Sequence, residues 1–350
     1  MIIRNAILLR TLPGILILLM CLYVVNAEAA CERKQLKKAA DTYMAMLERH
    51  SPEKLLLAEN ARFTENGKEM QVGEGLWKTA GKILLKRTVI DTEQCGTHTQ
   101  AVIEETGRPI IFGVRLKNAN DGKISEIETY VAREKEFAFY AEGLLKTKNQ
   151  KWENVISPKD RTTRDAMITA ADNYFLMFSK EPKVEVSFVR PCDRWENGTL
   201  TTVKTSTVSV IEGAPEHDCS PKGLVTPRHG PRRFLVDEEA GVVVAYVRFS
   251  SLLPDFHMFR MRKGKIDLIQ AVIGANSGRY YGASTVRSYR HPRKTPVPLN
   301  STSDRSGDSP VLPPNYFQKT FAYMLNFGIK SIFPSWLRLL CRFRNGNRLT

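Results

Sequence analysis

The chain of 350 residues has room for two domains of ordinary size, and its 42 % hydrophobic and 25 % charged residues are typical of a globular protein. The formal net charge of +15 favours acidic partners, but eleven Lys and Arg against two Asp, or +9, lie between Arg287 and the C-terminus. This distribution argues against a nucleic-acid partner and favours a membrane surface or an acidic partner that binds the basic tail.

Residues 1–30 have the pattern of a secretory signal sequence. Arg4 and Arg10 precede an apolar run from Ile15 to Val25, which ends in small residues. An uncleaved signal anchor is the alternative, and no later stretch is long and apolar enough to span a membrane. We therefore predict a protein that is secreted or in the secretory pathway.

The pattern over residues 31–150 predicts an α+β domain. Leu36, Ala40, Tyr43 and Leu47 fall on one stripe of a helix, and the pair Asn66-Gly67 predicts a hairpin turn. The expected elements are a helix over 33–49, a second short helix from Ser51, a strand over 61–65, a third helix over 76–86, and strands over 110–116 and 123–131.

A second domain of the same class is predicted over residues 160–285. Its expected elements are a helix over 163–178 and strands over 184–196, 201–211, 233–237, 241–249 and 258–273. Each domain is thus expected to be cone-shaped, with two to three N-terminal helices packed on a curved antiparallel sheet.

The remaining C-terminal part divides in two. Residues 286–315 are rich in Pro, Ser, Arg and Asp, which predicts a disordered linker. Residues 316–350 alternate aromatic and basic side chains, and Pro334 should divide them into two helices. This basic amphipathic segment is predicted either to lie on a membrane or partner or to pack back on the domains.

An oxidising compartment favours disulfides between the cysteines that remain after the signal sequence. One bridge in each domain gives Cys31–Cys95 and Cys192–Cys219, which leaves Cys341 free or intermolecular. The chain has no Cys-x-x-Cys pair and no spaced His/Cys cluster, so we expect no metal site.

Two sequons, at Asn197 and Asn300, predict N-glycosylation of a secreted chain. Asn197 lies inside a motif that the chain contains twice, so a glycan there would argue against a buried site in the second domain.

The duplication itself is visible in the sequence. Tyr43 and the triplet Glu65-Asn66-Gly67 recur, about 131 residues later, as Tyr174 and Glu196-Asn197-Gly198. Further on, Gly122-Lys123-Ile124 is echoed by Gly264-Lys265-Ile266. Arg115-Leu116 precedes the first of these and is echoed by Arg248-Phe249 before the second. The chain therefore contains two copies of one domain.

A helix with an inward tyrosine, a strand that ends in a carboxylate, and a closing pair of strands resemble the ketosteroid-isomerase branch of the nuclear-transport-factor-2-like (NTF2-like) superfamily. The resemblance covers residues 33–133 and 164–275. More narrowly, the Arg-Phe-Thr-Glu-Asn-Gly motif over 62–67 and Gly73-Glu74-Gly75-Leu76-Trp77 are similar to a secreted, mostly fungal family of unassigned function.

The resemblance implies a catalytic set. In the isomerases a tyrosine on the first helix donates a hydrogen bond to the developing oxyanion, a carboxylate moves the proton, and a second acid completes the oxyanion hole. By position, Tyr43 and Glu65 match the tyrosine and the base in the first domain, and Tyr174 and Glu196 match them in the second. Counting back from Arg115 and Arg248 places Phe112 and Ala245 where the second acid should stand.

Other residues are weaker candidates for ligand binding. Arg115 and Arg248 would favour an anionic ligand such as a carboxylate if they pointed inward, and Trp77 is a core residue or a ligand platform. Strand alternation places Arg194 on the same face as Glu196, where it would neutralise that carboxylate. His98 and His257 are candidates to enter a pocket, although a single histidine is more often at the surface or in a core where its hydrogen bonds are satisfied.

The resemblance implies cofactor-independent isomerisation or cyclisation of a small carbonyl compound that is apolar or bears a carboxylate. Fungal biosynthetic clusters use secreted members of this superfamily for such steps, including the joining of maleic-anhydride-type units into dimers. The alternative is a non-catalytic secreted module that binds a lipid-like ligand or a host protein. A buried Glu65 within reach of Tyr43 would favour the enzyme, and an exposed Glu65 with a filled cone would favour the binding module.

Overall fold

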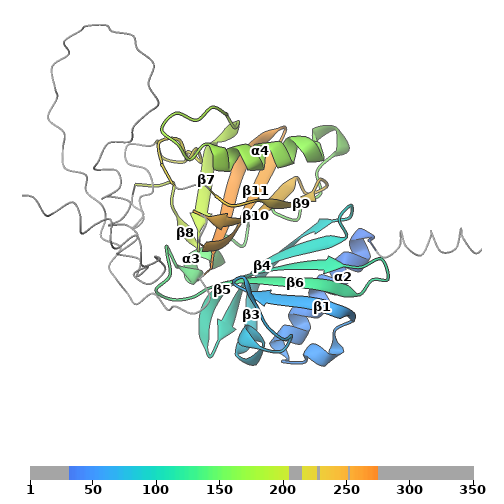
Figure 1. The fold of residues 1–350 in the computed structure, drawn as a ribbon. Coiled ribbons are helices and arrows are strands. Elements are labelled where there is room, and N and C mark those ends of the chain that lie inside the picture. The colour runs from blue at the N-terminus through green and yellow to red at the C-terminus, as the bar shows by residue number, and fades with distance from the viewer. Residues whose placement is uncertain (1–30, 205–214, 227–228, 251–252, 275–350) are drawn as a thin grey trace, which may run out of the picture. The chain divides into compact units, whose positions relative to one another are not determined.

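A computed structural model describes residues 31–204, 215–226, 229–250 and 253–274. They form two six-stranded sheets, each with one long helix on it (Figure 1). The strand orders are β2-β1-β6-β5-β4-β3 and β8-β7-β12-β11-β10-β9. Because each strand of the first sheet has a counterpart at the same place in the second, the two halves of the chain are repeats of one α+β unit.

The first repeat contains α2 (Arg33–Glu48), η1 (Pro52–Lys54), β1 (Leu57–Glu65), β2 (Lys68–Glu69), η2 (Gly75–Lys78), β3 (Ala80–Asp91), β4 (Gly96–Glu105), β5 (Arg108–Asn118) and β6 (Ile124–Ala132). The connecting segment contains α3 (Ala141–Leu145) and η3 (Pro158–Asp160). The second repeat contains α4 (Arg164–Leu176), β7 (Phe188–Glu196), β8 (Thr199–Leu200), β9 (Arg233–Asp237), β10 (Val242–Phe249), β11 (Leu253–Arg262) and β12 (Lys265–Ile273).

Several predictions concern residues outside the described ranges. They are the signal sequence over 1–30, the sequon at Asn300, Cys341, the linker over 286–315 and the segment over 316–350. Within the ranges that are described, no helix is long and apolar enough to cross a membrane.

Helix α2 covers the inner face of the first sheet with the stripe that the sequence predicts. Its buried residues are Leu36, Ala40, Tyr43, Met44 and Leu47, at spacings of three and four. The helix ends before His50, which has a φ of +55°, and Pro52 follows shortly after. Proline disfavours a helical conformation in the residue before it, so the chain turns here toward β1.

The predicted helix over 76–86 is wrong. Leu76 and Trp77 enter the core from the short 3-10 turn η2, and β3 then begins at Ala80. Exposure alternates from residue to residue between Gly81 and Lys86, as expected for a strand that is covered on one face. The second predicted helix is the 3-10 turn η1, so the described part of the first repeat has one α-helix, α2, and two 3-10 turns, and the described part of the second has one α-helix, α4.

The sheets are mixed rather than purely antiparallel, because β1 pairs with β6 and β7 pairs with β12 in parallel. The strand predicted over 258–273 is a hairpin of β11 and β12, with Lys263 and Gly264 at its turn. No strand continues over 201–204, and the rest of the strand predicted over 201–211 lies outside the described residues.

The repeated Asn-Gly pairs are hairpin turns that are locked to the neighbouring strand. All four residues have positive φ, between +43° and +84°, as a type I′ turn requires. The Asn66 side chain exchanges two hydrogen bonds with the backbone of Val131, at 2.8 and 3.0 Å. Asn197 does the same with Ile273, at 2.8 and 2.9 Å. We call this pair of side-chain hydrogen bonds the Asn-Gly clamp. The repeated motif therefore has the same structural role in both repeats, which is to join the hairpin turn to the neighbouring strand.

Both predicted disulfides are present. Cys31 is bonded to Cys95, which ties the start of the first repeat to the turn between β3 and β4. Cys192 is bonded to Cys219, which ties β7 to the segment over 215–226.

The outer faces of the two sheets pack on each other. One hydrophobic cluster contains Val102 and Ile111 of the first repeat together with Val244 and Phe256 of the second. A Cβ atom at Gly113 would overlap the Phe256 ring, so glycine allows this close approach. Each sheet thus has its outer face in the interface between the repeats and its inner face under its own helix.

Candidate active site

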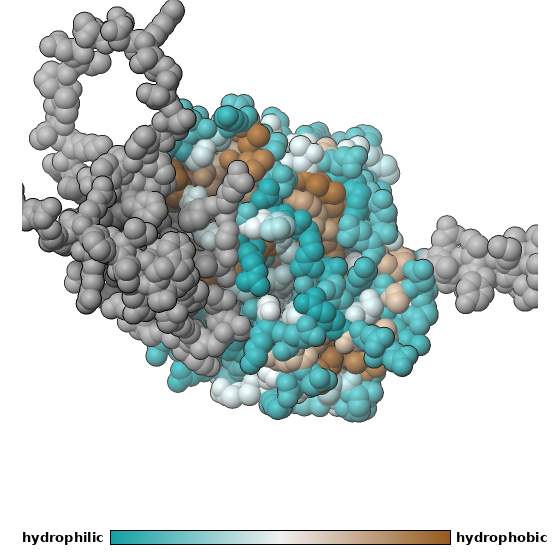
Figure 2. Space-filling view, viewed as in Figure 1, coloured by the Kyte–Doolittle hydropathy of each residue, from teal (hydrophilic) through white to brown (hydrophobic). Residues whose placement is uncertain are grey.

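In each repeat the helix and the inner face of the sheet enclose a space that is called the cone below. The described surface gives little reason to place a site outside these two cones. On the face seen in Figure 2 most described residues are hydrophilic, and apolar residues are exposed in separate patches. Scattered exposed apolar residues are normal for a globular protein. The inner face of each sheet, under α2 and α4, is the remaining place for a site.

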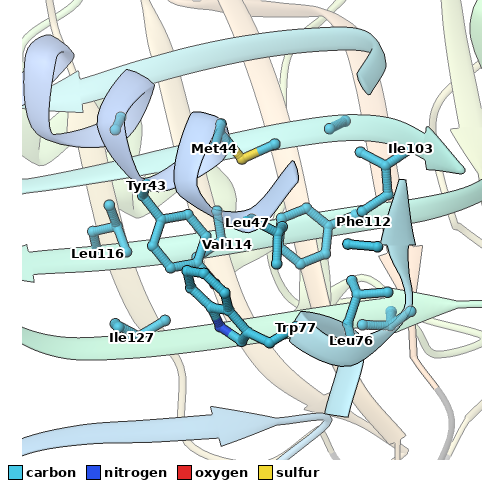
Figure 3. Packing of buried hydrophobic residues seen from close by; sticks show 14 of the residues in the cluster. Tyr43, Met44, Leu47, Leu76, Trp77, Ile103, Phe112, Val114, Leu116 and Ile127 are labelled. Atoms are coloured by element: carbon cyan, nitrogen blue, oxygen red, sulfur yellow. The ribbon is translucent and has the colours of Figure 1, made fainter. Parts of the chain in front are cut away.

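The first cone is filled by its own side chains (Figure 3). Tyr43 is 0 % exposed, and its ring packs edge-on against Trp77, with 5.3 Å between the ring centroids. The Tyr43 hydroxyl and the indole N–H of Trp77 have no hydrogen-bond partner among the described residues. Burial, together with the nearby Glu65, raises the pKa of Tyr43 above its ordinary value, so it stays neutral. Trp77 is therefore a core residue rather than a ligand platform.

Glu65, at the end of β1, connects three segments of the first repeat through a hydrogen bond and an ion pair. Its Oε2 accepts a hydrogen bond of 2.9 Å from the backbone N–H of Leu76, and its Oε1 lies 3.6 Å from Arg133 Nη2. The side chain is 12 % exposed, and it makes no hydrogen bond to Tyr43. Glu65 and Tyr43 are thus not joined as a donor and a base would be, and the filled cone favours a structural role for the first repeat.

The second cone has a charged cluster where the first is apolar. Arg194 is 3 % exposed, and its Nη1 lies 3.5 Å from the Tyr174 hydroxyl and donates 3.2 Å to the Cys219 carbonyl. Arg194 Nε donates to Thr201 Oγ1 at 3.2 Å and lies 3.6 Å from Glu196 Oε2. The ion pair with Glu196 that strand alternation predicts is therefore present. Burial raises the pKa of Tyr174 to about 12, so its hydroxyl is neutral at physiological pH.

Strand register shows which residue of the second repeat corresponds to Phe112. Glu65 pairs with Thr129 on β6, and Phe112 pairs with Val131, two residues further on. In the second repeat Glu196 pairs with Ala271 on β12, and Asp255 pairs with Ile273, again two residues further on. Asp255 therefore occupies the place of Phe112, which is the position expected for the second acid.

The sequence count that placed Ala245 there is wrong because it matched Arg248 with Arg115. Arg248 lies on β10, which corresponds to β4, whereas Arg115 lies on β5, which corresponds to β11. Counting from the Gly264 turn instead leads to β11. There, Asp255 and His257 alternate with the outward-facing Phe256 and Met258.

Asp255 and His257 form a buried pair on the inner wall. Both side chains are 0 % exposed, and His257 Nδ1 lies 3.0 Å from Asp255 Oδ1. The His257 ring centroid lies 5.7 Å from that of Tyr174, which connects the pair to the Arg194 cluster. Burial raises the pKa of Asp255, and His257 opposes this effect only in part.

Three polar atoms of the second cone make no hydrogen bond among the described residues: Glu196 Oε2, whose only contact is the 3.6 Å ion pair with Arg194, Asp255 Oδ2 and His257 Nε2. A buried polar group without a partner costs about 1–3 kcal/mol, more when it is charged. Groups of this kind in one cluster are typical of a site that a ligand completes.

Arg115 and Arg248 do not line either cone. Arg115 lies on the outer face of the first sheet, where its Nη1 contacts Glu126 Oε2 at 2.6 Å and Glu128 Oε2 at 3.0 Å. Arg248 is exposed on β10. Neither guanidinium can therefore reach a ligand in a cone.

The glycosylation predicted at Asn197 does not fit the fold. Its side chain is 0 % exposed, and the amide nitrogen that would carry a glycan donates to the carbonyls of Phe137 and Ile273 at 2.8 and 2.9 Å. Among the described residues, no group of three or more His, Cys, Asp or Glu is placed to hold a metal ion.

The two sheets have the same strand order and each is covered by one helix, so the chain is a tandem repeat of one α+β domain. The chain belongs to the family described as "Domain of unknown function (DUF8021)", whose model matches residues 29–131 and 160–273, one match per repeat. No curated protein matches the chain.

Solved structures similar to this chain align with about one repeat. An NTF2-like protein of unknown function from Burkholderia xenovorans is 16 % identical over 30 % of this chain and 88 % of its own, with a TM-score of 0.24. An NTF2-like protein of unknown function from Cytophaga hutchinsonii is 14 % identical over 28 % of this chain and 89 % of its own, with a TM-score of 0.21. The de novo designed NTF2 fold protein NT-9 is 14 % identical over 34 % of this chain and 97 % of its own, with a TM-score of 0.21.

Proposed function

We propose that the second repeat binds a small carbonyl compound in its cone and removes a proton from the carbon next to the carbonyl, without a cofactor. One observation carries this proposal. Tyr174, Glu196 and Asp255 occupy the three positions that the resemblance assigns to the hydrogen-bond donor, the base and the second acid. The first repeat has Phe112 at the third position.

The cluster gives each of these residues a role. Glu196 takes the proton on Oε2, which accepts no hydrogen bond among the described residues and lies 3.6 Å from Arg194 Nε. The Tyr174 hydroxyl accepts a hydrogen bond from Arg194, so its own hydrogen is free to be donated to the developing oxyanion. The raised pKa of Asp255 favours a neutral acid, so the Asp255–His257 pair can supply a second proton donor.

The walls of the second cone favour a substrate with an apolar body. The Tyr174 ring is flanked by Phe175 and Phe259, at centroid distances of 5.4 and 5.0 Å. Arg194 adds a buried positive charge that would attract a carboxylate or an anhydride oxygen. An enolate formed here is an intermediate for isomerisation, for cyclisation and for the joining of anhydride units, so these remain the reactions we propose.

A non-catalytic ligand-binding module is the second candidate. The filled first cone favours it, because Trp77 and Leu76 occupy the space that a ligand would take in that repeat. In this reading the charged cluster of the second cone binds an anionic ligand and leaves it unchanged.

Deuterium exchange separates these two functions without knowledge of the product. The protein is incubated in D2O with a panel of cyclic ketones, lactones and anhydrides, and deuterium next to the carbonyl is measured by mass spectrometry. We expect exchange with the wild type, its loss in Glu196→Gln, and wild-type exchange in the matched variant Glu65→Gln. Equal exchange in Glu196→Gln and wild type, or binding of a probe without exchange, would overturn the proposed enzyme.

A further inference from the structure

We infer that His257 is a second proton carrier of this site, and that the substrate has a hydroxyl group on the carbon β to its carbonyl. The reaction is then the elimination of water from a β-hydroxy carbonyl compound, or its reversal. This inference rests on the proposed function, because it needs the carbanion that Glu196 generates.

The hydrogen bonding of His257 leaves one nitrogen for chemistry. Nδ1 is bonded to Asp255 at 3.0 Å, which fixes the orientation of the imidazole. Nε2 is buried and has no partner among the described residues. The rings of Tyr174 and Phe175 lie beside the imidazole, with centroids at 5.7 and 5.1 Å, and we assign the hydrogen-bond partner of Nε2 to a ligand.

The fold itself does not require this histidine. By the same register that matches Asp255 with Phe112, His257 pairs with Ala271 as Val114 pairs with Thr129. The first repeat therefore closes the same wall with Phe112 and Val114, both buried in its core. Replacing two well-packed apolar residues with a buried Asp-His pair costs stability, and a role in chemistry explains why the second repeat has the pair.

The site holds two proton-transferring groups, Glu196 and His257, while isomerisation can return the same proton from a single base. In the elimination Glu196 takes the proton from the carbon next to the carbonyl, and the electron pair moves into the enolate, whose oxygen Tyr174 stabilises. The enolate then re-forms the carbonyl and a C=C bond as the β C–O bond breaks. The leaving hydroxide takes the proton from His257 Nε2 and departs as water.

Asp255 balances the proton count at His257. Its proton passes from Oδ1 to Nδ1 as Nε2 gives up its own, so the ring remains neutral throughout. After the products leave, water takes the proton from Glu196 and returns one to Asp255. No oxidant, reductant or cofactor is needed, because water is the only product besides the enone.

Two β-hydroxy ketones, 3-hydroxycyclohexanone and 4-hydroxy-4-phenyl-2-butanone, test the inference as probes. Deuterium exchange next to the carbonyl and formation of the conjugated enone, followed by its absorbance, are measured on the same samples. The variant His257→Val introduces the side chain of the first repeat at this position, so we expect it to fold. His257→Gln keeps a polar group there.

We expect the wild type to exchange deuterium and to release water. His257→Val should lower enone formation by about 10²–10⁴-fold more than it lowers deuterium exchange, because only the elimination needs a general acid for the leaving hydroxide. A purely structural role would lower both rates together. Enone formation at the wild-type rate in His257→Val, or exchange without any enone in the wild type, would overturn the inference and leave the proposed function standing. A wild type that exchanges neither probe, nor any compound of the wider carbonyl panel, counts against the proposed function, and this inference falls with it.

Discussion

Arg164 of the second repeat forms a bidentate ion pair with Asp91 of the first, with contacts of 3.0 and 2.7 Å. The reciprocal pair, Arg33 of the first repeat with Asp237 of the second, has contacts of 2.8 and 2.9 Å. Asp91 Oδ2 also accepts a hydrogen bond of 2.8 Å from the backbone N–H of Val236. The repeats therefore meet as two copies related by a pseudo-twofold axis, as subunits do in a symmetric dimer.

This arrangement predicts that the repeats unfold together. Asp91→Asn should lower the free energy of unfolding by about 3–5 kcal/mol, because it removes the buried charge that pairs with Arg164 and leaves the exposed Glu93 as the remaining carboxylate of that arginine. Urea unfolding followed by circular dichroism measures the change. Asp121→Asn is the matched control, since Asp121 is 54 % exposed in the β5–β6 turn and its loss should cost less than about 0.5 kcal/mol.

Two separate unfolding transitions in the wild type, or an Asp91→Asn variant as stable as Asp121→Asn, would contradict this coupling between the repeats.

Much of the fold could be predicted from the sequence, because local patterns specify it. The stripe in α2 and the alternation in β5 give the period of each element, and the Asn-Gly pairs have the residues that a type I′ turn requires. The disulfides followed from one cysteine pair per repeat. The helix over 76–86 could not be excluded, because Leu76, Trp77, Leu84 and Leu85 also fit a helical stripe and only the neighbouring β4 shows that this segment pairs as a strand.

The candidate site was predicted only in part, since it depends on register across strands. Tyr174 and Glu196 repeat the spacing of Tyr43 and Glu65, which can be read directly from the sequence. Asp255 replaces Phe112 and has no counterpart of its own kind, so no repeat of sequence marks it. The recurrence of an arginine led instead to Ala245, because β10 and β11, two strands of similar composition, follow each other directly before the Gly264 turn.

The Asn-Gly clamps predict that replacing either asparagine lowers stability by a similar amount. Asn66→Ala and Asn197→Ala should each lower stability by about 1–3 kcal/mol, because the backbone groups of Val131 and Ile273 would lose their partners. Thermal unfolding of the two variants measures this.

Peptide mass spectrometry of protein from a glycosylating host should show Asn197 without a glycan, and a fully occupied sequon at Asn197 in folded protein would refute the buried position described here.

Glu136 predicts a stability change between about pH 4.5 and 7. Burial raises the pKa of Glu136 from 4.5 to about 7, against the opposing effect of Arg133. Because the folded state holds this proton more tightly than the unfolded state, the added stability is full below pH 4.5 and is lost as the pH rises through 7. The loss should be about 1–3 kcal/mol for a partly exposed group.

Glu136→Gln tests this, because glutamine does not titrate. The difference in unfolding free energy between variant and wild type should grow in favour of the variant from pH 4.5 to pH 7.5, as measured by urea titrations at several pH values. A constant difference over this range would show that the Glu136 carboxyl titrates normally.

The two disulfides predict different effects on the proposed site, although both close long loops. Their cysteines lie 64 and 27 residues apart, so removing either bridge should cost about 3–4 kcal/mol by the loop-entropy model. Only the Cys192–Cys219 bridge holds a group of the site, because the Cys219 carbonyl accepts a hydrogen bond from Arg194 at 3.2 Å. The double variant Cys192→Ser/Cys219→Ser should therefore lose deuterium exchange as well as stability. The matched variant Cys31→Ser/Cys95→Ser should lose stability alone, when both are assayed at a temperature where each is folded. Equal exchange in the two variants would show that Arg194 does not depend on this bridge for its position.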